Sequence, residues 1–166
     1  MRTSSSPGKI LATVDEIVAR SVAKWPNVPA VYGWLSLDRR GNWLIKGEKI
    51  ANTALREFIA RNYEADDRGR WYFQNGPQRV YVSLADTPLV VRYEGDRLVD
   101  HCGRPFTPSA ALEDDAGSVL FPGSGTVGLL DDRDLARFAE QNPALKPVAK
   151  AEIEARFGFV ADPRPG

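Results

Sequence analysis

Residues 71–84 read WYFQNGPQRVYVSL and carry the clearest β-hairpin signal in the chain. Two runs rich in aromatic and β-branched residues, 71–74 and 78–84, flank the pair Asn75-Gly76. This pair favours a tight turn because both residue types tolerate a positive φ. We therefore predict two antiparallel strands here, since strands joined by a short turn run in opposite directions.

The second of these runs alternates between two chemical faces. Val80 and Val82 fall on one face of the predicted strand, whereas Arg79 and Tyr81 fall on the other. The valine face is expected to pack on a core. Comparable patterns predict further strands at 31–37, 42–46, 89–93, 97–101, 118–121 and 126–129, and helices at 10–24, 52–62, 148–157 and around 135–138.

These elements predict an α+β fold of mostly antiparallel sheets with flanking helices and an internal duplication of a strand-turn-helix unit. The duplication rests on an overlay of residues 41–62 on residues 117–142, in which two glycines are followed by Leu, Phe and Asn at matching mutual spacings. One such unit cannot bury its apolar face alone, so two copies are expected to share a core. The alternative is a chance match, because glycine turns followed by helices are common.

The chain has 166 residues, enough for one ordinary domain or two very small ones. We expect a disordered arm at 1–9, an N-terminal helix and linker at 10–30, and a first repeat unit at 31–66. An antiparallel β-rich unit that includes the second repeat is expected at 67–160, followed by a loose tail at 161–166.

The charge balance argues against two classes of partner. Lys and Arg total 22, and Asp and Glu also total 22, so the formal net charge is zero. Nucleic-acid binders usually carry a basic surplus, and an anionic membrane surface attracts one. With a single cysteine, no apolar run long enough to span a bilayer and no leader-like start, we expect a cytoplasmic protein that binds neither nucleic acid nor membrane.

Several segments resemble a family of uncharacterised bacterial proteins, a domain of unknown function. The resemblance lies in Gly41-Asn42-Trp43, Gly47, Ile50, Leu55, Phe58, 69–73, 78–82 and 86–90. It implies two repeated α and β units, one of them similar to a pleckstrin-homology-like fold. It also implies a small nucleotide-like ligand between the units and a signalling role. No activity and no functional residue comes with the resemblance.

One literal motif, Gly123-Ser124-Gly125-Thr126-Val127-Gly128, matches the phosphate-binding pattern of dinucleotide folds. That chemistry requires a helix directly after the glycines, with its N-terminus at the pyrophosphate. The residues that follow instead have strand character, and too little chain remains for a doubly wound sheet. We therefore interpret the motif as a hairpin turn.

No catalytic or metal-binding set stands out. His101 and Cys102 are the only His and the only Cys, and neighbours on a strand point to opposite faces, so they cannot form a nucleophile pair simply. The acidic runs 113–115 and 131–134 lack calcium-loop spacing and are expected to be solvated or helix-capping. We expect no catalytic residue, metal or cofactor.

The aromatic residues of the predicted strands suggest a binding surface. They are Trp34, Trp43, Trp71, Tyr72, Tyr81 and Tyr93. With nearby arginines they can stack on and clasp a planar or anionic ligand, although large aromatics more often belong to a core. The candidate contacts are Trp43, Arg79, Tyr81 and Arg92, in a groove between the two repeats.

Three functions follow as hypotheses. The first is a non-enzymatic module that binds a small nucleotide-like or anionic ligand and has a regulatory or signalling role. The second is an enzyme in which Asp86, Asp100 or Glu94 acts as acid or base beside arginines. The third is a module that pairs with another protein or with itself, through strand edges or an aromatic patch.

Overall fold

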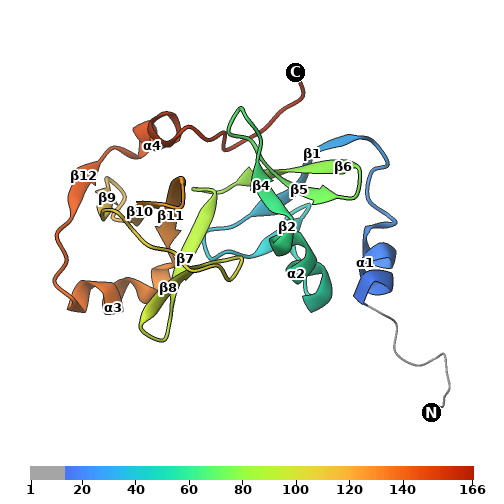
Figure 1. Cartoon of the computed structure of the whole chain (residues 1–166). Coiled ribbons are helices and arrows are strands. Elements are labelled where there is room, and N and C mark those ends of the chain that lie inside the picture. The colour runs from blue at the N-terminus through green and yellow to red at the C-terminus, as the bar shows by residue number, and fades with distance from the viewer. Residues whose placement is uncertain (1–13) are drawn as a thin grey trace, which may run out of the picture.

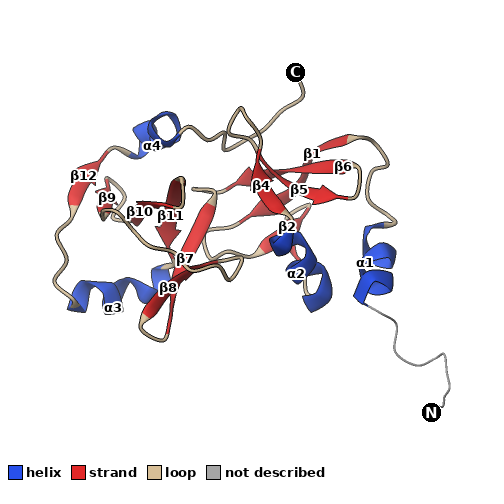
Figure 2. Cartoon of the chain, in the orientation of Figure 1, coloured by secondary structure: helices blue, strands red, loops and turns tan. Residues whose placement is uncertain are grey.

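The computed structural model describes residues 14–166, with four α-helices and twelve strands in that part of the chain (Figures 1 and 2). The helices are α1 (Val14–Val22), α2 (Thr53–Arg61), α3 (Leu135–Glu140) and α4 (Lys150–Phe157), and a short 3-10 helix η1 (Asp132–Asp134) precedes α3. The strands are β1 (Ala30–Leu37), β2 (Trp43–Ile45), β3 (Glu48–Lys49), β4 (Tyr63–Ala65), β5 (Trp71–Asn75), β6 (Gln78–Leu84), β7 (Leu89–Glu94), β8 (Arg97–Asp100), β9 (Leu112–Asp114), β10 (Val119–Gly123), β11 (Thr126–Leu130) and β12 (Lys146–Val148). The arm predicted at 1–9 and the first residues of the predicted N-terminal helix lie outside the described residues.

The strands form two mixed sheets of six strands each, so the predicted α+β class is confirmed. The first sheet has the order β3-β2-β1-β6-β5-β4, and the second has the order β12-β9-β10-β11-β7-β8. Most pairs are antiparallel, but β1 pairs with β6, β7 with β11, and β9 with β12 in parallel, which the turn pattern did not predict. Figure 1 shows the sheets side by side, with α1 and α2 beside the first and α3 and α4 around the second.

The two sheets share one strand order, which is compatible with the predicted duplication. In each, the first strand of the unit pairs in parallel with the last, as β1 does with β6 and β7 with β11. A hairpin partner, β2 or β8, lies on one side, and a meander, β4-β5-β6 or β9-β10-β11, forms the other. A bridge between Val99 and Pro105 beside β8 occupies the place that β3 holds in the first sheet. Only β12 has no counterpart.

A repeated turn supports this correspondence. Asp66 directly follows β4, and Asp114 is the last residue of β9; each carboxylate accepts two backbone N–H groups, at 2.8–3.0 Å. Each aspartate is followed by a glycine of positive φ three positions later, Gly69 or Gly117. These residues, and the phenylalanines of β5 and β10, recur at one constant offset. The structural repeat therefore matches β5 with β10, whereas the sequence overlay of 41–62 on 117–142 placed β2 opposite β10.

The chain passes from the first sheet to the second between Leu84 and Leu89, so the first unit comprises residues 14–84 and the second unit comprises residues from 89 onward. The domain division predicted from sequence, with units at 31–66 and 67–160, stays a prediction. At the end of the chain, the carbonyl of Ala161 accepts the backbone N–H of Leu84, at 2.7 Å, and Val160 bridges to Arg70.

A single apolar cluster runs through both units. The rings of Trp43 and Tyr63, from the first sheet, contact the imidazole of His101, which follows β8, with centroid separations of 5.1 and 5.4 Å. The hydroxyl of Tyr63 also donates to the carbonyl of Pro88, at 2.7 Å. These contacts fix the two sheets against each other. Among residues 14–166, no helix is long and apolar enough to cross a membrane.

The equivalent turn glycines provide a matched test of this packing. Both have positive φ, but a Cβ on Gly69 would lie 2.0 Å from the carbonyl oxygen of Gly158, whereas a Cβ on Gly117 would meet nothing within 4 Å. Gly117→Ala is expected to cost about 1 kcal/mol of stability through backbone strain alone. Gly69→Ala is expected to cost more than about 3 kcal/mol, because the backbone near Gly158 must also shift. Urea unfolding of the two variants measures the difference; equal losses would contradict the close approach at Gly69.

Candidate functional site

A cavity of about 710 Å³ opens between the two units, and we call it the interunit groove. The first unit supplies one wall from the turn between β1 and β2 and from α2. The second unit supplies the other wall from β7, from the turn after β8 and from η1. The lining residues are Arg40, Gly41, Asn42, Trp43, Thr53, Arg56, Glu57, Ala60, Arg61, Arg92, His101, Cys102, Gly103 and Arg133.

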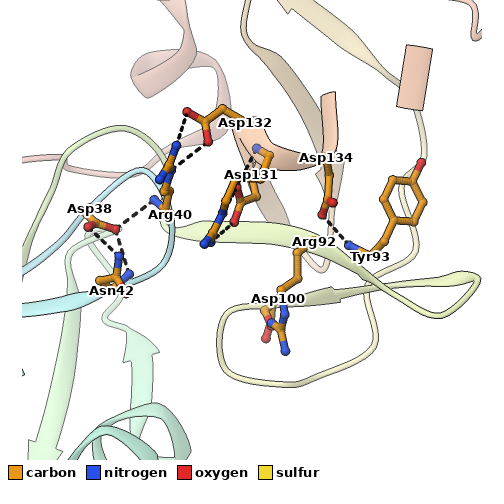
Figure 3. Close-up of polar contacts among 10 residues, drawn as sticks. Asp38, Arg40, Asn42, Arg92, Tyr93, Asp100, Asp131, Asp132 and Asp134 are labelled. Atoms are coloured by element: carbon orange, nitrogen blue, oxygen red, sulfur yellow. Dashed lines mark hydrogen bonds and ion pairs between the residues drawn. The ribbon is translucent and has the colours of Figure 1, made fainter. Parts of the chain in front are cut away.

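Two aspartate-anchored turns shape the groove, one from each unit. The carboxylate of Asp38 accepts the backbone N–H groups of Arg40 and Asn42, at 2.9 and 2.8 Å, and the side-chain amide of Asn42, at 2.9 Å (Figure 3). Burial raises the pKa of Asp38, but these hydrogen bonds outweigh it, so the net pKa lies below the usual value. Asp100 holds the opposite turn in the same way, through the N–H groups of Cys102 and Arg104, at 2.8 and 3.0 Å.

The groove is basic. Among the described residues, five arginines and one carboxylate, that of Glu57, line it. Three of the arginines carry an ion pair, shown in part in Figure 3: Arg40 with Asp132, Arg92 with Glu94, and Arg133 with Asp131. The other two, Arg56 and Arg61, have no carboxylate partner within residues 14–166.

The helix α2 presents these two unpaired arginines. Asn52 caps the helix, since its side chain accepts the N–H of Leu55 at 2.9 Å, and Leu55 and Ile59 bury one helix face in the core. Arg56 and Arg61 are exposed. A guanidinium without an internal carboxylate is available to bind an anionic group of a ligand. Arg56 donates to the hydroxyl of Thr53, at 3.0 Å, and Arg61 lies over the ring of Phe58, so neutral groups are the partners of both arginines in the described part of the chain.

His101 forms part of the wall and is held neutral. Burial is the largest cause and the charges of Arg104 and Arg92 add to it, and together they lower the pKa of His101 to about 3. The Nδ1 atom accepts the backbone N–H of Val90, at 3.1 Å, so the proton of the neutral ring lies on Nε2, which has no hydrogen-bond partner. Gly41 passes so close to this ring that a Cβ there would lie 2.7 Å from that of His101.

Cys102, also in the groove wall, carries a free and partly buried thiol. Burial raises the pKa of its thiol to about 12, and the charge of Asp100 adds to the effect. A thiol with such a pKa stays protonated at neutral pH, and the thiolate is the reactive form.

The structure brings together two of the four predicted contact residues. Trp43 and Arg92 both line the interunit groove. Trp43 is only 3% exposed, so it forms the floor and offers no free face for stacking. Arg92 donates to the carbonyl of Asp100, at 3.1 Å, and pairs with Glu94, at 3.3 Å.

The other two predicted contacts, Arg79 and Tyr81, lie outside the groove on the opposite face of the first sheet. Tyr81 is 4% exposed and stacks on Tyr32, with ring centroids 4.8 Å apart. The guanidinium of Arg79 lies 4.4 Å from the ring centroid of Tyr72, and that of Arg70 lies 4.8 Å from the ring of Tyr81. The arginines thus cover the tyrosine rings, and both predicted residues are used in packing.

Four groove arginines were missed by sequence reasoning: Arg40, Arg56, Arg61 and Arg133. They lie in turns or on the exposed side of a helix, where arginine is ordinary. One signal was available for Arg40, because it lies inside the Asp38-Arg39-Arg40-Gly41 turn, one of four turns with Asp three residues before a glycine of positive φ.

None of the three carboxylates of the enzyme hypothesis is among the lining residues of the groove. Asp86 pairs with Arg39 and is not a lining residue of the groove, and burial raises its pKa although Arg39 opposes this shift. Asp100 is committed to its turn, and Glu94 is 61% exposed beside Arg92. Within residues 14–166, no group of three or more His, Cys, Asp or Glu side chains is placed to hold a metal ion.

The glycine motif at 123–128 forms the turn of the β10-β11 hairpin, with Gly123 paired to Thr126, so the turn interpretation is confirmed. Asp131 caps η1 through the N–H of Arg133, as predicted for this acidic run. Asp114 was expected to be solvated and is instead 5% exposed. That prediction was wrong because the carboxylate anchors a buried turn.

Fold and site together define a two-sheet α+β protein with a basic groove between its units. A family model described as "Protein of unknown function (DUF2946)" matches residues 14–164, and the chain belongs to this family. This match confirms the predicted resemblance to a domain of unknown function.

Two solved structures are similar. One is a DUF1285 family protein from Silicibacter pomeroyi DSS-3, with 18% identity, a TM-score of 0.48, and coverage of 72% of this chain and 74% of that chain. The other is a DUF1285 family protein from Shewanella baltica OS155, with 17% identity, a TM-score of 0.49, and coverage of 64% of this chain and 91% of that chain. No curated protein matches the sequence.

Proposed function

We propose that this protein is a non-enzymatic module that binds a small anionic ligand in the interunit groove. The observation that carries the proposal is the lining itself, in which five arginines from both units meet one glutamate around a cavity of about 710 Å³. Small-molecule sites favour such concave positions between packed units. Arginine forks recognise phosphate and carboxylate groups with two parallel hydrogen bonds.

The contacts favour an anionic group over a stacked ring as the recognised feature. Trp43 is buried beneath the groove, and the predicted stacking residue Tyr81 is packed elsewhere. Arg56 and Arg61 are free of carboxylates on one wall, and Arg92 and Arg133 lie on the other. A ligand with two anionic groups can therefore bind both units at once, which supports a regulatory role for the groove.

The remaining parts of the proposal come from the sequence. They are a bacterial origin, a cytoplasmic location, a pleckstrin-homology-like fold for one unit and a signalling role. Nucleotides are the first ligands to test on these grounds, and pairing with a second copy or another protein stays compatible with a ligand-controlled module.

A thermal-shift screen tests the function with matched pairs of compounds. Nucleoside monophosphates and diphosphates, pyrophosphate and citrate are compared with the uncharged nucleosides. A ligand at about 100 times its Kd stabilises the folded state by about 2.7 kcal/mol. For a chain of this size that corresponds to a rise in Tm of about 5–10 °C.

The charged compounds are expected to raise the Tm in a manner that weakens with added salt, and the nucleosides are not. A flat response to every anion would overturn the proposal. A response to the uncharged nucleosides of equal size would show that the arginines are not the recognition element.

A further inference from the structure

Three acidic residues of the run 131–134 perform different tasks. Asp131 has a 3% exposed side chain and caps η1, and it also binds the guanidinium of Arg133, at 2.6 and 3.0 Å. Asp134 accepts the backbone N–H of Tyr93, at 2.9 Å, and so extends the hydrogen bonding of β7 (Figure 3). Both carboxylates therefore hold local structure.

Asp132 does not hold local structure. Its side chain is 56% exposed, and its one side-chain partner in the described part of the chain is Arg40, in the turn of the other unit. The two carboxylate oxygens of Asp132 accept from Nε and Nη2 of Arg40, at 2.9 and 3.3 Å (Figure 3). This two-pronged contact is the geometry with which arginine binds the carboxylate or phosphate of a ligand.

The contact also lies at the groove. Arg40 is a lining residue, and the carboxylate that occupies its fork belongs to the opposite wall. We propose that Asp132 is an internal competitor: its carboxylate occupies an anion subsite at Arg40, and the phosphate or carboxylate group of the ligand binds there by displacing it. This inference rests on the proposed function and specifies where the anionic group binds and what opposes it.

The energetics permit the exchange. An ion pair between exposed side chains contributes little, because each partner loses hydration and side-chain freedom for a screened attraction. Arg40 is 49% exposed and Asp132 is 56% exposed. No backbone group among residues 14–166 donates to the Asp132 carboxylate, so the side chain can turn into solvent when the ligand arrives. Removal of its charge is then expected to tighten ligand binding by about two- to five-fold.

A purely structural role makes the opposite prediction. If the pair mainly holds the two units together, its loss loosens the groove and weakens the binding of any ligand that contacts both walls. Tighter ligand binding by Asp132→Asn therefore indicates an internal competitor, and weaker binding indicates a structural role of the ion pair.

The experiment measures the affinity of the full chain for pyrophosphate and for citrate by isothermal titration calorimetry. The proteins are wild type, D132N, R40A and the double variant R40A/D132N. A matched control is D162N, because Asp162 is 59% exposed and pairs with Arg164, outside the groove lining. The two probes distinguish phosphate from carboxylate as the preferred group.

D132N is expected to bind the preferred probe about two- to five-fold more tightly than wild type, with D162N unchanged. In the R40A background the substitution of Asp132 is expected to bring no gain, because the subsite is gone. A gain that persists without Arg40 reflects charge at a distance and overturns the assignment of the subsite, as does an unchanged or weaker affinity of D132N.

The test separates the two proposals. If wild type binds and D132N shows no gain in affinity, the role of Asp132 as a competitor is contradicted and the proposed groove function is retained. If neither protein binds either probe, the proposed groove function is contradicted, and the competitor role that rests on it is contradicted as well.

Discussion

The double charge reversal Arg56→Glu with Arg92→Glu is expected to weaken binding of an anionic ligand by more than about 100-fold. A hydrogen bond to a charged group contributes about 1.5–3 kcal/mol, so loss of two such bonds alone reaches this range. The new carboxylates also repel the ligand. The two residues lie on opposite walls of the groove, one on α2 and one on β7, so the variant tests recognition by both units.

The matched control is the reversal Arg79→Glu. Arg79 is an exposed arginine on a strand of the first sheet, outside the groove, and sequence reasoning had proposed it as a ligand contact. Circular dichroism and Tm of each variant verify folding before binding is measured by calorimetry. A loss of affinity in Arg79→Glu as large as in the groove variant would move the site to the opposite face of the first sheet.

The second large effect is acid destabilisation through His101. Its pKa is about 3 in the folded protein, because burial opposes the charged form, compared with 6.5 for an exposed histidine. Between these two values the unfolded chain binds a proton that the folded chain does not. The free energy of unfolding therefore falls as the pH falls below about 6.5, by at most about 1.4 kcal/mol per pH unit.

His101→Asn isolates this effect, because asparagine retains an acceptor for the N–H of Val90 but does not titrate. From pH 7 to pH 5, wild type is expected to lose about 2 kcal/mol more stability than the variant, measured by urea unfolding. The pKa of Asp86 is raised in the folded state, so its contribution to the free energy of unfolding has the opposite pH dependence. Because both proteins contain Asp86, this contribution cancels in the comparison. Equal pH dependence of the two proteins would show that the imidazole is accessible to protons in the folded state.

Sequence patterns predicted the fold class because it depends on local rules. The alternation around Val80 and Val82, and turn pairs such as Asn75-Gly76, report which face of a strand is buried and where it reverses. Even here the turn residues proved to be Gly76 and Pro77, since Asn75 pairs with Gln78. The parallel pairs were missed because they join strands distant in sequence, for which no local signal exists.

The sequence overlay and the arrangement of the strands pair different segments of the two sheets. Leu, Phe and Asn on helices recur in many chains, and they drew the overlay toward α2 and α3. The more specific signal was the turn with Asp66, Asp67 and Gly69, which recurs as Asp114, Asp115 and Gly117. In both turns the first aspartate accepts the same pattern of backbone N–H groups. A polar side chain that anchors a turn constrains sequence more tightly than an apolar position does.

The groove was placed between the two units from sequence, yet most of its arginines were not identified. Arg56, Arg61 and Arg133 become a site only when α2 of one unit faces η1 of the other. Tyr81 had the residue type expected of a contact, but its face is closed by Arg70 and by other tyrosines. Composition identifies which residues can bind an anion, and tertiary packing decides which of them remain free.

The most direct measurement of the central claim is an amide chemical-shift titration of the isotope-labelled protein with pyrophosphate. The account predicts that saturable shifts concentrate at 40–43, 53–61, 101–103 and 133, on both walls of the interunit groove, and that R56E/R92E abolishes them. Shifts centred on β5 and β6 around Arg79 and Tyr81, or no saturable shifts at all, would contradict it.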